Sequence, residues 1–137
     1  MTTTLTTPHS LNHFDSFELA AYAANLADSK KSRDTLVLDV RHISHFADYF
    51  VICSAESPTQ VRTMTDAIQK AFREQGLMPT STERDTTSRW SLLDYGDIVI
   101  HIMHQQERAF YNLESFWSHG TPVPAGKWQN EGMLRAS

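Results

Sequence analysis

The sequence predicts an α/β (α+β) sandwich, in which helices flank a single mixed β-sheet. The segments with regular apolar spacing follow the order α-β-β-α-β-β-β-α, which is typical of helices packed on one sheet. Residues 35–40 and 49–54 are apolar on both faces, as expected for central strands that are covered on both sides. A chain of 137 residues fits one domain.

Composition divides the chain into three parts. Residues 1–13 are polar and are expected to form a disordered N-terminal segment, whereas residues 14–117 are expected to form the domain. Residues 118–137 contain Gly and Pro and are interpreted as a C-terminal tail. The sequence leaves open whether Trp128, in this tail, folds back or reaches a partner.

Capping signals place the first two helices. Asp15 and Glu18 are spaced as a capping box, so the first helix is expected at residues 16–29. Ser57 can cap the second helix, with Pro58 at its first position and Gln60 three residues after the cap. Apolar residues follow at helical spacing, and a glycine closes this helix: Val61, Met64, Ile68, Ala71, Phe72 and Gly76.

Three strands and a helix are expected in the second half. Residues 79–84 are polar and predict an edge strand, and residues 90–93 and 97–103 predict a hairpin that turns at Gly96. The closing helix is expected at 107–117. Its core face should carry Phe110, Leu113 and Trp117.

Charge and cysteine content narrow the class of protein. The net charge of -4, from 16 acidic and 12 basic residues, argues against a nucleic-acid binder. An acidic protein can still contact the basic proteins of a ribonucleoprotein particle. The lone Cys53 lies in an apolar run, which predicts a buried inert thiol and a reducing compartment. No apolar run approaches the roughly 20 residues of a membrane span, so we expect a cytoplasmic protein.

The hairpin turn carries the main candidate site. Asp94, Tyr95 and Asp97 flank Gly96, and the period of two places Trp90 and Leu92 on the same strand face as Asp94. A solvated turn explains this spacing. A docking surface also explains it, because an aromatic anchor rimmed by carboxylates suits a basic protein partner.

Enzymatic and metal-binding interpretations fit the sequence less well. Asp94 and Asp97 are three residues apart across a turn, so they do not share a strand face as a metal-binding carboxylate pair would. The turn before the second helix, 53–58, has no glycine, and its Glu56 would repel phosphate. His101 and His104 would point to opposite faces of a strand, and His42 and His45 have no fixed geometry toward them. We therefore expect no cofactor, no metal and no catalytic residues.

A combination of motifs resembles the ribosomal silencing factor family, also called Iojap or RsfS. The resemblance covers about residues 16–117. It rests on Asp48-Tyr49-Phe50-Val51-Ile52, Ser57-Pro58-Thr59-Gln60-Val61-Arg62, Trp90-Ser91-Leu92-Leu93-Asp94-Tyr95-Gly96-Asp97, His101 and Phe110-Tyr111-Asn112-Leu113-Glu114.

The resemblance implies a fold related to nucleotidyltransferases without the transferase residues. It also implies binding to the large ribosomal subunit through its ribosomal protein fourteen, which blocks subunit joining and represses translation when nutrients or energy are short. Family members are commonly homodimers when free. The implied partner-binding residues of this chain are Trp90, Leu92, Asp94, Tyr95 and Asp97, with Tyr111 and Glu114 as weaker candidates.

Two features of this chain depart from the family pattern. Cys53 and Ala55-Glu56 replace the small Gly, Ser or Thr residues that are usual in the family after the second strand, and the tail from Ser118 extends beyond the usual family end. Two other functional classes also fit the sequence. A nucleotide-using enzyme would be detected by thermal stabilisation with ATP or CTP and magnesium. A large-subunit assembly factor would use the same contacts as a silencing factor, so sequence does not separate these two.

Overall fold

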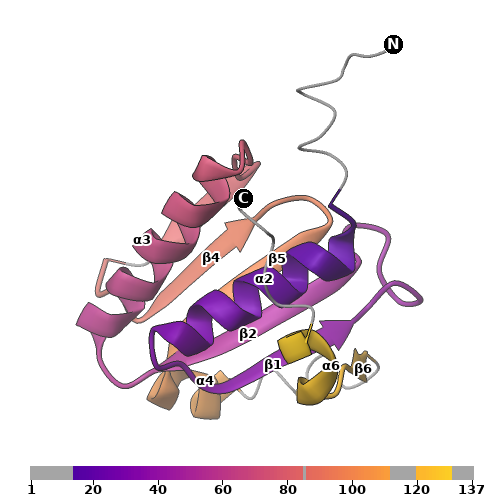
Figure 1. The fold of residues 1–137 in the computed structure, drawn as a ribbon. Helices are drawn as coiled ribbons and strands as arrows, with labels where there is room; N and C mark the ends of the chain where they lie inside the picture. Colours follow the sequence, from indigo (N-terminus) through magenta and orange to yellow (C-terminus); the bar gives the residue numbers. More distant parts are fainter. Residues whose placement is uncertain (1–13, 85, 112–119, 131–137) are drawn as a thin grey trace.

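The computed structural model describes residues 14–84, 86–111 and 120–130 and confirms the predicted fold class. A six-stranded mixed sheet has the strand order β3-β4-β5-β2-β1-β6 (Figure 1). Only β2 and β5 run parallel among these neighbours; the other pairs are antiparallel. The strands are β1 (Arg33–Asp39), β2 (Tyr49–Ala55), β3 (Ser81–Arg84), β4 (Trp90–Asp94), β5 (Ile98–His104) and β6 (Thr121–Pro122).

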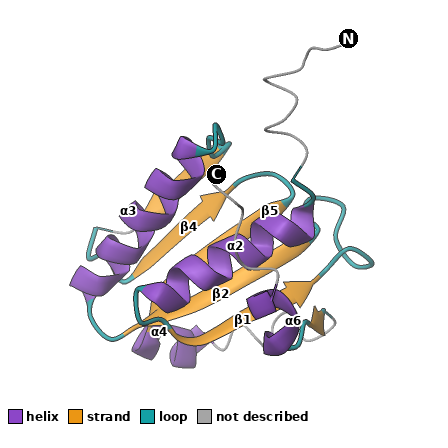
Figure 2. Cartoon of the chain, viewed as in Figure 1, coloured by secondary structure: helices purple, strands orange, loops and turns teal. Residues whose placement is uncertain are grey.

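The two long helices lie side by side over one face of the sheet (Figure 2). They are α2 (Ser16–Ser29) and α3 (Pro58–Glu74). The short α4 (Gln105–Tyr111) continues from β5 at one end of the sheet, and α6 (Ala125–Asn130) packs against α2. None of the helices in the described ranges is long and apolar enough to cross a membrane.

Both predicted helix starts are confirmed. The Asp15 carboxylate accepts a hydrogen bond from Glu18 N (2.7 Å), and the Glu18 carboxylate accepts one from Asp15 N (3.0 Å). Ser57 Oγ accepts from Gln60 N (3.1 Å), and Pro58 is the first residue of α3. These contacts satisfy backbone donors that a helix leaves free at its N-terminus.

The five predicted strands are present, with bounds that differ from the predictions by at most two residues. β2 is buried along its whole length between β1 and β5, and the exposed β3 lies at the sheet edge as expected. β1 begins at Arg33, two residues before the predicted start. Its register shifts between Arg33 and Leu36, where Asp34 has a positive φ of 50°. The polar residues at this irregularity have low β-propensity, which explains why the sequence predicts a later start for β1.

Apolar side chains form a core on each face of the sheet. The larger core lies between the sheet and the two long helices and includes Val51, Ile100, Leu93, Met64 and Phe72. The smaller core lies on the opposite face. It contains Leu38, Val40, Ala47, Phe50, Ile52 and Met103, with Leu36, Trp90 and Val99 packed against it.

Residues 120–130 pack against the rest of the domain, which differs from their interpretation as part of a tail. β6 pairs with β1 through Leu38 opposite Pro122 and Asp39 opposite Thr121. Trp128 of α6 is only 2% exposed and belongs to the larger core. Asn25 Nδ2 of α2 donates to Trp128 O (3.0 Å). Trp128 therefore folds back, because burying its indole stabilises the closed arrangement.

The last predicted helix is described only in part. α4 begins at Gln105, two residues before the expected start, and its described part ends at Tyr111. Residues 112–119, with Leu113 and Trp117 of the predicted apolar face, lie outside the described residues, as does the expected domain boundary at 117.

Candidate protein-docking site

The predicted hairpin forms the framework of the site. β4 and β5 pair antiparallel, with Leu92 opposite His101 and Asp94 opposite Val99. Gly96 has a φ of +87°, a conformation that most L side chains avoid. Asp94 Oδ1 accepts a hydrogen bond from Gly96 N (2.8 Å), so this carboxylate also holds the turn in shape.

Alternation along β4 separates the predicted site residues from the core. Ser91 and Leu93 are buried toward the helices, whereas Trp90, Leu92 and Asp94 are half-buried on the opposite face. The expectation that these three side chains share a face is confirmed. An indole, an aliphatic side chain and a carboxylate thus lie in a row on the sheet face that α2 and α3 leave uncovered (Figure 1).

Tyr95 lies differently from the expectation that the turn displays its ring. The ring packs on Phe72 of α3, with centroids 4.5 Å apart and planes inclined by 40°. The Tyr95 hydroxyl is buried with no hydrogen-bond partner among the described residues, and burial raises its pKa to about 12. No local sequence pattern indicates this contact, because the turn and α3 are distant in the chain. Partner binding by Tyr95 stays a prediction.

Asp97 is exposed at the end of the turn. Its backbone carbonyl accepts hydrogen bonds from Asp48 N (2.7 Å) and Tyr49 N (3.2 Å), which fixes the turn to the start of β2. The adjoining β1–β2 loop carries Phe46, which is 91% exposed and which sequence reasoning did not select. The Asp97 side chain is thus exposed to a partner, whereas the two hydrogen bonds to its carbonyl hold its backbone in place.

His101 lies on the same sheet face as Trp90, Leu92 and Asp94, which we call the docking face, and stands opposite Leu92 in the pairing of β4 and β5. Its ring centroid is 5.7 Å from that of Phe50 and 6.3 Å from that of Trp90. Burial lowers its pKa to about 4, so the imidazole is neutral at physiological pH. Its Nδ1 has no hydrogen-bond partner within the described part of the chain. His101 is thus a packing residue beside Trp90.

The remaining predicted residues lie at the limit of the described chain. Tyr111 is the final residue of α4, and its side chain is outside the description. Glu114 falls within residues 112–119, which the structure does not describe.

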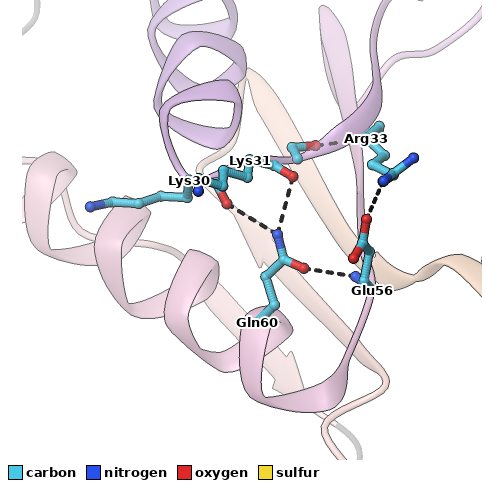
Figure 3. A network of polar contacts seen from close by, with 6 residues as sticks. Lys30, Lys31, Arg33, Glu56 and Gln60 are labelled. Carbon is cyan, nitrogen blue, oxygen red and sulfur yellow. Dashed lines mark hydrogen bonds and ion pairs between the residues drawn. The ribbon is translucent and has the colours of Figure 1, made fainter.

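The start of α3 is closed by the protein's own side chains. Gln60 Oε1 accepts from Glu56 N (2.8 Å), and Gln60 Nε2 donates to the carbonyls of Lys30 and Lys31 (3.1 Å each), as Figure 3 shows. Gln60 therefore links the end of α2 to the start of α3 and does not reach the Ser57 backbone as a capping box would.

This closure leaves little for a phosphate to bind. The Glu56 and Gln60 backbone donors are already occupied, and the Glu56 carboxylate, which pairs with Arg33, adds negative charge. A helix N-terminus binds anions only through free N–H groups. The arrangement favours a structural junction over a nucleotide site.

The structure also disfavours a reactive cysteine and a metal site. Cys53 is fully buried, as predicted, and burial raises the pKa of its thiol to about 12, which leaves it unreactive. His101 and His104 occupy opposite faces of β5, as expected from their spacing. No cluster of three His, Cys, Asp or Glu side chains able to hold a metal occurs in residues 14–84, 86–111 and 120–130.

Comparison with known proteins assigns the chain and its fold to a family. A family model described as "Ribosomal silencing factor during starvation" matches residues 13–134, including most of the segment expected beyond the family's usual end. The proteins named ribosomal silencing factor RsfS from Halalkalibacterium halodurans and Bacillus subtilis are similar in sequence. The first is 39% identical over 106 residues, covering 77% of this chain and 91% of the relative. The second is 41% identical over 95 residues, covering 69% and 80%.

A solved structure is also similar. The crystal structure of a Bacillus halodurans protein superposes with a TM-score of 0.69 at 37% identity, covering 78% of this chain and 97% of the other. Sequence and fold thus agree.

Proposed function

Because this chain belongs to the ribosomal silencing factor family, we propose that it binds the large ribosomal subunit and blocks its joining to the small subunit. The family's named role is regulatory rather than enzymatic. The proposed contact on the ribosome is ribosomal protein fourteen of the large subunit, and the proposed outcome is repression of translation under nutrient or energy limitation.

One observation carries this proposal: the row of Trp90, Leu92 and Asp94 on the uncovered face of β4. When a partner removes the remaining surface of half-buried apolar groups from water, the complex is stabilised. Carboxylates at the rim attract Lys and Arg and raise the rate of encounter with a basic ribosomal protein. Docking of this kind requires no chemistry, because occupying the subunit interface excludes the small subunit sterically.

The proposal extends to the free protein. We place it in the cytoplasm, where ribosomes join, and we propose that it forms a homodimer when not bound. The exposed Phe46 and Ile43 of the β1–β2 loop support a contact between two copies, since large exposed apolar side chains are costly in a lone monomer.

Co-sedimentation with isolated subunits tests the docking surface. Asp97→Lys reverses a charge at the exposed end of the turn, and the Asp97 side chain makes no hydrogen bond to any described residue that this change would remove. We expect this variant to bind large subunits about tenfold or more weakly than the wild type, because like charges would then face each other. The matched control is Glu74→Lys at the end of α3, an exposed site with the same change of charge in the helical layer.

The outcomes separate the site from the function. Binding by the wild type and the Glu74→Lys control, with loss in Asp97→Lys, supports the proposed surface. Equal binding by all three proteins places the contact elsewhere. Failure of the wild type to bind large subunits contradicts the function itself.

A further inference from the structure

A depression in the docking face lies beside the predicted residues, at the open edge of the sheet. It has a volume of about 290 Å³ and is lined by Glu83, Arg84, Trp90 and Leu92. In the antiparallel pairing of β3 and β4, Glu83 stands opposite Leu92, so their side chains share a face. Trp90 lies two residues earlier on the same face of β4. The depression therefore joins an exposed carboxylate to a half-buried indole.

The basic residues near the depression are engaged elsewhere. Arg84 also lines the depression, but its guanidinium lies on the opposite face of β3, where Nη2 is 3.4 Å from Asp66 of α3. Arg89 pairs with Glu107 (2.8 Å) and donates to Gln106 (2.9 Å).

Glu83 has no such partner. Its carboxylate forms neither an ion pair nor a hydrogen bond with any residue that the structure describes. Every residue of β3 is exposed, and the outer edge of this strand pairs with no other strand of the described sheet. Within the described ranges, no side chain therefore neutralises the negative charge of Glu83.

We propose that this depression receives an arginine side chain of a protein of the large ribosomal subunit. The guanidinium would lie against the indole of Trp90 and form charge-assisted hydrogen bonds with the Glu83 carboxylate. The aliphatic part of the same side chain would cover Leu92. Glu83 thereby becomes a specificity-determining residue of the docking surface, a role that rests on the proposed function.

Arginine fits this arrangement better than other occupants. Its planar group can stack on an aromatic ring and bind a carboxylate through two N–H groups at once, which a lysine ammonium does not do. RNA is disfavoured, because Glu83 and Asp94 on this face would repel its phosphates. The inference therefore specifies a protein contact and not a contact with ribosomal RNA.

Binding of isolated large subunits by Glu83→Gln tests the contact. Gln keeps the size and polarity of Glu83 while removing its charge, and the exposed position makes a loss of fold unexpected. We expect the dissociation constant to rise about tenfold, since a charge-assisted contact becomes a neutral one. The control Glu74→Gln makes the same substitution at an exposed position of α3 and should bind as the wild type does.

A cross-link identifies the occupant. A photoreactive amino acid at Ser81, which is exposed and opposite Asp94 on the same face as Glu83, should react with a ribosomal protein peptide that contains arginine. A cross-link to ribosomal RNA, to a peptide without arginine, or to nothing in a complex that co-sediments overturns the inference. Wild-type binding with an unchanged Glu83→Gln variant also overturns it and leaves the proposed function standing. If the wild type does not bind large subunits, both the inference and the proposed function are contradicted.

Discussion

Burial of His101 predicts a specific loss of stability in mild acid. The pKa of this imidazole falls from 6.5 to about 4 on folding, because desolvation disfavours the charged form. Above pH 6.5 the side chain is neutral in both the folded and the unfolded state, so its contribution to stability is constant. Between pH 6.5 and about 4 the unfolded chain binds a proton that the folded protein excludes. The free energy of unfolding should fall by about 3 kcal/mol across this window.

The packing around His101 supports this magnitude. Aromatic rings of Phe50 and Trp90 lie next to it, and its Nδ1 has no hydrogen-bond partner within the described residues. Asp39 acts in a different window. Its hydrogen bond from Arg41 lowers its carboxyl pKa below 3.8, so its stabilisation is present above that pH and is lost only below it.

Urea unfolding of the wild type and His101→Gln, repeated from pH 8 to pH 4, measures the effect. Glutamine does not titrate, so the variant should lack the His101 part of the slope even though it is less stable throughout. A proton NMR titration should place the His101 midpoint near pH 4. Parallel slopes for the two proteins, or a midpoint near 6.5, would refute the burial argument.

Three further changes test the packing of the domain. Trp128→Ala should cost about 3–5 kcal/mol in urea unfolding, because it empties a core position, whereas Gln129→Ala on the exposed side should change little; a loss below about 1 kcal/mol would mean that α6 is not docked. Gln60→Ala should cost about 1–3 kcal/mol in the same measurement, since three side-chain hydrogen bonds disappear, two of them to the end of α2 and one to Glu56 N; unchanged stability would show that water replaces them. Tyr95→Phe should keep or raise the melting temperature, because it removes a buried hydroxyl that lacks a partner among the described residues; a marked decrease would reveal a hydrogen bond to this group.

Local chemistry made much of the fold predictable. The capping box of Asp15 and Glu18 and the Ser57-Pro58 start fixed two helix boundaries, because these residues act on backbone groups only a few positions away. Gly96 marked the hairpin for the same reason, through its own backbone conformation.

Tertiary contacts explain what sequence reasoning missed. β6 contains Pro122 and is two residues long, so no local signal identifies it, and its pairing depends on the burial of Trp128 in a distant core. Proline is tolerated there because β6 is an edge strand. Glu83 escaped selection because its place beside Trp90 depends on the register between β3 and β4. The ring of Tyr95 turns toward Phe72 for a similar reason, since α3 is far away in sequence.

An order-of-addition joining assay tests the central claim most directly. Large subunits are first saturated with the protein, small subunits are then added, and joined ribosomes are measured by light scattering and on a sucrose gradient. We expect joining to fall in proportion to the occupied large subunits, and the protein to co-migrate with the free large subunit. Full joining by large subunits that demonstrably carry the protein would contradict silencing and favour a role in large-subunit assembly.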